Sequence, residues 1–278
     1  MKIASKARES REVTRGPVPG RFTEGAGASP RRIEVWLAEL GLSAEALEAL
    51  ETGTARLAPE DHERFGALAP ASAHRERRLA HIALRALIER AFGSRWRRVP
   101  YVVGPTGRLS LPGLAGDFSL AHSADCALIG LTRAGAIGVD IETSRPVAIP
   151  AARRVGIEAA ALRLAVPTAL PSEPEARFLQ AWVRLEAYAK AQGHGIGHAL
   201  EALGVRGRRD GETRDRPGEP TFAVQDLELG HDLFAAVASS MPPPEPLEVW
   251  HLPRSAEALE ALMAGAAPNL IKRDPIKR

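Results

Sequence analysis

Two carboxylates on one expected strand are the first residues of this chain that could do chemistry. The run 137–142, Ile-Gly-Val-Asp-Ile-Glu, predicts a β-strand, whose side chains alternate between two faces. Asp140 and Glu142 therefore point the same way, whereas Val139 and Ile141 face the core. Two carboxylates on one face can hold a hard cation such as Mg²⁺, which takes oxygen ligands. An Asp-x-Glu pattern alone is also typical of a solvated strand face.

The second candidate is a glutamate and a lysine on an expected helix. Glu186 and Lys190 lie four residues apart, so they are neighbours on the helix surface. Taken alone, such a pair is most often a modest helix-stabilising contact. Apolar residues of the same run recur at helical spacing and predict one buried stripe, formed by Phe178, Trp182, Leu185 and Ala189.

Together with a third run upstream, these residues resemble the signature of the 4′-phosphopantetheinyl transferases, in the longer, monomeric type that activates surfactin-synthetase-like assembly lines. The family pattern is Gly-x-Asp-x-Glu, followed by Trp-x-x-Lys-Glu-Ala-x-x-Lys. The third run is Phe-Ser-Leu-Ala-His-Ser at 118–123, preceded by Gly107-Arg108. It stands where that family carries Phe-Asn-Leu-Ser-His-Ser, preceded by Gly-Lys-Pro. The resemblance spans roughly residues 33–249.

The resemblance implies a role for each of these residues. Mg²⁺ would be held by Asp140, Glu142 and Glu186. Glu186 would also act as the general base, and Lys190 would stabilise the departing 3′,5′-ADP. The phosphates of coenzyme A, the co-substrate, would be bound by Arg75, with Arg77 or Arg78 on the same helix as alternatives, and by Arg108, His122 and Ser123. Without the motif around it, a histidine such as His122 beside a strand is more often a packing residue.

The implied reaction transfers the 4′-phosphopantetheine group from coenzyme A to a serine of an apo acyl or peptidyl carrier protein. The enzyme would be a phosphopantetheinyl transferase of the holo-[acyl-carrier-protein] synthase type. Three positions depart from the family pattern: Leu185 replaces a lysine, Ala121 a serine and Leu109 a proline. The alternative is therefore a catalytically impaired homologue of the same fold that binds coenzyme A.

The resemblance also implies the fold, which would be α+β with two similar α/β subdomains in a pseudo-two-fold arrangement and coenzyme A in the cleft between them. The expected boundaries are a mobile basic tail over 1–30, an N-terminal subdomain over 31–133 and a C-terminal subdomain with the metal site over 134–253. A helix and a basic tail follow over 254–278. Because two copies of the small fold share one chain, we expect a monomer.

Composition limits the other function classes. The chain has 278 residues, a formal net charge of +3 and a single cysteine, Cys126. One cysteine excludes an intrachain disulfide and favours a reducing cytoplasm. The sequence has neither an apolar run of spanning length nor a secretory signal, so we expect no membrane span. Aromatic residues are only 5% of the chain and do not alternate with the arginine clusters, which disfavours nucleic-acid binding.

The pattern of apolar residues, glycines and prolines predicts the elements that must position these groups. Because Gly195 and Gly197 interrupt the region after the glutamate–lysine helix, His194 and His198 are expected in a loop. Strands are expected over 33–40, 221–227, 233–238 and 247–252, and helices over 44–51, from 59 onward, over 72–92, 158–165 and 256–263.

Overall fold

The structure is a computed structural model that describes residues 33–66, 71–164, 168–205, 222–241 and 247–270. The expected tail over 1–30 and the basic tail after residue 270 lie outside the described residues.

The first of two main sheets has five strands in the order β10-β9-β1-β5-β4. They are β1 (Ile33–Glu39), β4 (Asp117–Ser123), β5 (Cys126–Thr132), β9 (Val249–His251) and β10 (Asn269–Leu270). β5 pairs antiparallel with both β1 and β4. β9 comes from the far end of the described chain and pairs parallel to β1.

The second main sheet has three antiparallel strands in the order β6-β8-β7. They are β6 (Ile137–Thr143), β7 (Ala223–Glu228) and β8 (Leu233–Ser239). A small hairpin of β2 (Val102–Val103) and β3 (Leu109–Ser110) lies apart from both sheets. With mainly antiparallel sheets and helices on their outer faces, the fold belongs to the α+β class.

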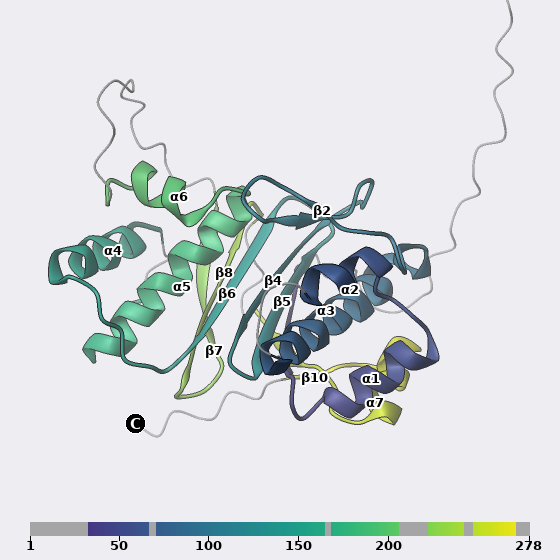
Figure 1. Cartoon of the computed structure of the whole chain (residues 1–278). Coiled ribbons are helices and arrows are strands. Elements are labelled where there is room, and N and C mark those ends of the chain that lie inside the picture. Colours follow the sequence, from purple (N-terminus) through teal and green to yellow (C-terminus); the bar gives the residue numbers. More distant parts are fainter. Residues whose placement is uncertain (1–32, 67–70, 165–167, 206–221, 242–246, 271–278) are drawn as a thin grey trace, which may run out of the picture. The chain divides into compact units, whose positions relative to one another are not determined.

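The helices form two groups, one on each side of the strands (Figure 1). The first sheet is covered by α1 (Ala44–Gly53), α3 (Ala71–Phe92) and α7 (Ala256–Met263), with α2 (Pro59–Gly66) against α3 and a 3₁₀ turn over Ser94–Trp96 after it. The second sheet is covered by α5 (Pro174–Gln192), on which α4 (Ala151–Leu164) and α6 (Ile196–Ala202) pack. In the part of the chain that the structure describes, no helix combines the length and the apolar character needed to cross a bilayer.

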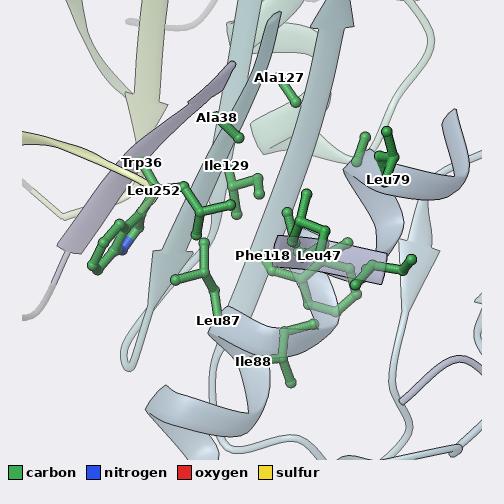
Figure 2. Close-up of a cluster of buried hydrophobic side chains, with 14 of the residues drawn as sticks. Trp36, Ala38, Leu47, Leu79, Leu87, Ile88, Phe118, Ala127, Ile129 and Leu252 are labelled. Carbon is green, nitrogen blue, oxygen red and sulfur yellow. The ribbon is translucent and has the colours of Figure 1, made fainter. Parts of the chain in front are cut away.

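Strand alternation divides the interior into three layers of buried side chains. On β1, Trp36 and Ala38 point to the first helix group (Figure 2), whereas Val35 and Leu37 point to the second sheet. A third layer lies between the second sheet and α5. The two sheets therefore pack face to face, with one group of helices outside each of them.

Most of the expected elements are confirmed, with shifted ends. The helix expected from residue 158 begins at Ala151. The loop expected around His198 is wrong, because that residue lies inside α6. Gly195 does not interrupt this helix, since it stands at the N-cap in an extended conformation. β9 lies in the sequence range expected for the C-terminal subdomain but pairs with β1 in the first sheet.

A buried ion pair fixes α5 to the second sheet. The guanidinium of Arg184 is fully buried and donates two hydrogen bonds to Asp226 on β7, of 2.7 Å from Nε and 2.6 Å from Nη2. It also donates to the carbonyl of Thr168, at 3.0 Å. This bidentate geometry fixes both the rotation of α5 about its axis and its distance from the sheet.

We expect Asp226→Asn to lower the free energy of unfolding by about 3–5 kcal/mol, because it leaves the Arg184 charge buried without its counter-charge. Urea unfolding measures the loss. The control is Glu48→Gln, which breaks the exposed Arg75–Glu48 pair and is expected to cost less than about 1 kcal/mol. Equal losses for the two variants would contradict the role given to the buried pair.

Candidate functional site

The carboxylate strand β6 has one face toward the first sheet and the other toward α5. Ile137, Val139 and Ile141 are buried in the layer between the two sheets. The alternating residues Gly138 and Asp140 point to the α5 side, as expected for a strand. The expectation that Val139 and Ile141 face the core is therefore confirmed.

Gly138 is the point of closest approach between β6 and α5. A Cβ atom at this position would lie 2.0 Å from the carbonyl oxygen of Ala187 and 2.4 Å from the backbone nitrogen of Ala191. Both are backbone atoms of the helix, which cannot move aside as the end of a flexible side chain can. Only glycine allows the helix to lie this close to the strand.

This close approach brings Lys190 onto Asp140. The Nζ atom of Lys190 lies 2.6 Å from Oδ1 of Asp140 and donates a second hydrogen bond, of 3.2 Å, to the carbonyl of Val139. Asp140 is buried, and this burial raises the pKa of its carboxyl, while the charge of Lys190 lowers it. Lys190 is therefore the cation that supports a buried carboxylate.

Glu186 lies one helical turn before Lys190 on α5 and has a strongly altered pKa. Burial raises the pKa of its carboxyl to about 7, and the charge of Asp140 acts in the same direction. Lys190 lowers this pKa, and Glu142 raises it further. The three carboxylates are thus close enough to influence one another, and Glu186 exchanges its proton near neutral pH, as a general acid or base must.

Glu142 is held at the end of β6 by two neighbours. Ser123 on β4 donates its hydroxyl to Oε2 of Glu142 at 3.2 Å, and it accepts the backbone N–H of Thr143 at 3.1 Å. Arg145 donates to both carboxylate oxygens, at 3.2 and 3.4 Å. Ser123, expected to contact a cofactor, therefore holds Glu142 in this structure.

A pocket of about 260 Å³ is lined in part by Lys190, the ion-pair partner of Asp140. Its walls come from α3, the β2–β3 hairpin, β4 and the C-terminal end of α5. We call it the basic pocket, because its polar lining contains cationic and imidazole groups and no carboxylate: His81, Arg108, His122, Lys190 and His194, together with Thr106 and Ser119. Such a lining suits a phosphate-bearing ligand.

Contacts between the hairpin loop and α5 shape the mouth of this pocket. Arg108 forms an ion pair with Asp117 and donates to the carbonyl of Ile137 at 3.2 Å. Thr106 donates its hydroxyl to the carbonyl of Gly193, at 3.1 Å. Gly193 ends α5 in a left-handed conformation, with φ of 74°, which turns the chain back toward the loop.

His122 lies in this basic surrounding on β4. Partial burial lowers the pKa of its imidazole most, and the charges of Arg77 and Lys190 lower it further, while Glu76 acts in the opposite direction. Its ring is therefore mainly neutral at pH 7, able to donate one hydrogen bond and to accept another.

Of the residues selected from sequence, Arg75 alone stands away from the others. Its side chain is exposed and forms an ion pair with Glu48 on α1, at 3.3 Å, and it does not line the basic pocket. Arg77, two residues further along α3, lies on another side of the helix, and its charge lowers the pKa of His122. The other seven lie together: Arg108, His122, Ser123, Asp140, Glu142, Glu186 and Lys190.

Several residues of the site were not selected from sequence, among them His81, Thr106, Ser119 and His194. A glycine inside an expected strand is a signal of close backbone approach, and it could have identified the role of Gly138. The lining residues carry no such signal, because they come together only through the packing of separate elements.

The position of Leu185 gives a structural reason for one departure from the family pattern. Its side chain is fully buried in the layer between α5 and the second sheet, and it does not line the basic pocket. A leucine is suited to this apolar position.

The chemistry of the three carboxylates fits a divalent cation. Asp140, Glu142 and Glu186 offer oxygen ligands of the kind that a hard divalent cation takes, and burial and the charges of Asp140 and Glu142 raise the pKa of Glu186. Within the described ranges, no three histidine, cysteine or acidic side chains are already arranged around one point as metal ligands. The metal site therefore stays a prediction.

Comparison with known proteins supports the resemblance seen in the sequence. No protein-family model matches the chain. Over 128 residues the chain is 30% identical to a Synechocystis sp. protein named "putative 4′-phosphopantetheinyl transferase". The matched region covers 44% of this chain and 51% of that protein, so the chain spans about half the length of this relative. The similarity is distant and supports the phosphopantetheinyl transferase superfamily.

We expect Gly138→Ala to lower the free energy of unfolding by about 1–3 kcal/mol, because the added methyl group pushes α5 away from β6. Urea unfolding measures the loss. The control is Gly53→Ala at the end of α1, where an added Cβ meets nothing within 4 Å. A Gly138→Ala variant as stable as this control would show that the helix does not depend on the close approach.

The altered pKa of Glu186 predicts a pH dependence of stability. The native state keeps this carboxyl protonated up to about pH 7, whereas its ordinary pKa is 4.5, so unfolding releases a proton between these values. The free energy of unfolding therefore falls as the pH rises from 4.5 to 7, by on the order of 3 kcal/mol.

This dependence is measured by urea unfolding at several pH values with a chelator present. Glu186→Gln should reduce the fall, because glutamine is neutral throughout and, of the two raised carboxyl pKa values at the site, only that of Asp140 then contributes. Glu201→Gln, an exposed position on α6, should keep the wild-type profile. If Glu186→Gln and wild type show the same slope, Glu186 does not carry the effect.

Proposed function

We propose that this protein transfers the 4′-phosphopantetheine group of coenzyme A to a serine of an apo acyl or peptidyl carrier protein. The observation that carries the proposal is the cluster of Glu186, a carboxyl with a pKa of about 7, with Asp140, Glu142 and Lys190, the last of which lines the basic pocket. This arrangement supports a role for Glu186 as the proton acceptor beside a site for phosphates. The motif resemblance and the distant Synechocystis relative point to the same superfamily.

The basic pocket supplies the groups that the coenzyme would need. Coenzyme A carries a pyrophosphate and a 3′-phosphate, and Arg108, His122 and Lys190 offer donors for these oxygens. Arg108 is already oriented by Asp117, so little side-chain freedom is lost when it binds. This pre-organisation favours a bound geometry in which the pyrophosphate lies beside the carboxylates.

A Mg²⁺ ion held by Asp140, Glu142 and Glu186 would neutralise charge on the pyrophosphate. The chain's own groups then handle the proton and the leaving group. The oxygen of the carrier serine forms a bond to the β-phosphorus, and the bond from that phosphorus to the bridging oxygen breaks. Glu186 accepts the serine proton, and Lys190 stabilises the negative charge that remains on 3′,5′-ADP.

The finer features of the proposal come from the family resemblance. They are the long type of transferase, a pseudo-two-fold arrangement of two similar halves, a monomer, and the cytoplasm as the compartment. Two sheets that pack face to face, each with its own helices outside, are compatible with two related halves. The same features would belong to a homologue that binds coenzyme A without transfer, and the experiment below separates these two functions.

The test is intact-mass analysis of several apo carrier proteins after incubation with this protein, coenzyme A and Mg²⁺. We expect a mass gain equal to one phosphopantetheine group. Glu186→Gln should reduce the rate by about 10²–10⁴-fold, since it removes the proton acceptor. Glu201→Gln should transfer at the wild-type rate.

Two outcomes would oppose the proposal. Full turnover by Glu186→Gln would exclude its role as the base. Absence of transfer to every carrier, with coenzyme A still bound, would favour the impaired coenzyme-A-binding homologue. A carrier whose acceptor serine is replaced by alanine should gain no mass, which confirms the site of attachment.

A further inference from the structure

We propose that the side chains of β4 are positioning residues that set the register of β6 and thereby the places of Asp140, Glu142 and Lys190. This inference rests on the proposed function, because it names the residues that would hold its catalytic groups. The observation behind it is a row of hydrogen bonds that joins the two sheets, which we call the β4–β6 seam.

The seam joins β4 and β6 where these two strands are not paired through their backbones. β6 pairs with β8 along one edge, and alternate N–H groups of a paired strand point to its other edge. On that other edge, three N–H groups of β6 donate to side chains of β4: Ile137 to Asp117 at 2.9 Å, Val139 to Ser119 at 3.1 Å and Thr143 to Ser123 at 3.1 Å. The partners in each bond are 20 residues apart, so the two strands run in the same direction and in a fixed register.

Ser119 acts on the centre of the site through a single residue of β6, Val139. Its hydroxyl accepts the N–H of Val139 at 3.1 Å, and the carbonyl of Val139 accepts a hydrogen bond from Nζ of Lys190 at 3.2 Å. Lys190 in turn holds Asp140. A buried hydroxyl on β4 thus fixes the strand segment from which both charged groups take their positions.

The two outer bonds of the seam are also shared with the site. Asp117, which accepts the N–H of Ile137, forms the ion pair with Arg108 in the basic pocket. Ser123, which accepts the N–H of Thr143, donates to Glu142. Every hydrogen bond of the seam therefore involves a residue that also contacts the site. Hydrogen bonds that served only to hold the two sheets together would not need to involve such residues.

One position of the seam has no acceptor. The 20-residue offset places Ala121 opposite Ile141, and the alanine methyl group cannot accept its N–H. Asp140, the residue before Ile141, is held instead by the ion pair with Lys190.

The test compares Ser119→Ala, Ser119→Thr and Ser110→Ala in the full chain. Ser110 lies on β3 with an exposed hydroxyl outside both the seam and the pocket. Amide hydrogen exchange of Val139 and the kinetics of phosphopantetheine transfer are measured for each variant.

In Ser119→Ala we expect faster exchange at Val139 and a kcat lower by about tenfold or more. The KM for coenzyme A should stay within about twofold, because misplacement of the catalytic groups affects the reacting geometry. Ser119→Thr keeps the hydroxyl and should restore both values, and Ser110→Ala should match wild type.

The wild-type protein offers a measurement that needs no variant to fold. Protection of the Val139 amide is expected, although no backbone carbonyl of a neighbouring strand pairs with it. Unprotected exchange at Val139 in wild type, or exchange unchanged by Ser119→Ala, would overturn the inference. A raised KM for coenzyme A with unchanged kcat would also overturn it, because Ser119 would then be a direct ligand contact. If wild type transfers nothing to any carrier, the proposed function fails, and the exchange data alone decide the inference.

Discussion

The contact between α5 and β6 at Gly138 is the constraint on which the site depends. Without a side chain at this position, the helix backbone rests against the strand, and Lys190 reaches Asp140 at 2.6 Å. The same contact buries Asp140 and partly buries Glu186, so it produces the altered pKa values as well as the geometry. The Arg184–Asp226 pair sets the helix against the same sheet from its middle turns. The altered pKa values and the packing of the site therefore both result from the contact between α5 and β6.

The site lies where two layers of different character meet. α5 and β6 supply its carboxylates and Lys190, whereas β4, α3 and the hairpin supply the basic pocket. The β4–β6 seam joins these two parts through side chains instead of a continuous strand ladder. Side-chain hydrogen bonds of this kind fix the position of one sheet relative to the other, although the two sheets are not joined by backbone pairing. Acidic and basic groups can thus lie side by side without neutralising each other completely.

Much of the fold and most of the candidate site could be predicted from the sequence, for identifiable physical reasons. Alternation on β6 and helical spacing on α5 are local, so the faces of Val139 and Ile141, and most helix and strand positions, followed from short windows. Arg75 could not be placed this way, because two positions along a helix change the direction of a side chain by about half a turn. Ser119 and Thr106 gained their roles only from tertiary packing. β9 was expected as a strand, but its parallel pairing with β1 is a long-range contact that no local pattern contains.

That pairing has a consequence for the order in which the protein can be made. β1 is near the start of the described chain and β9 near its end, so the two strands leave the ribosome far apart in time. During synthesis one edge of β1 lacks its native neighbour, and an unpaired edge is prone to join other strands. α7, which covers α1, arrives even later. The first sheet therefore cannot be complete until the strand that begins at Val249 has been synthesised.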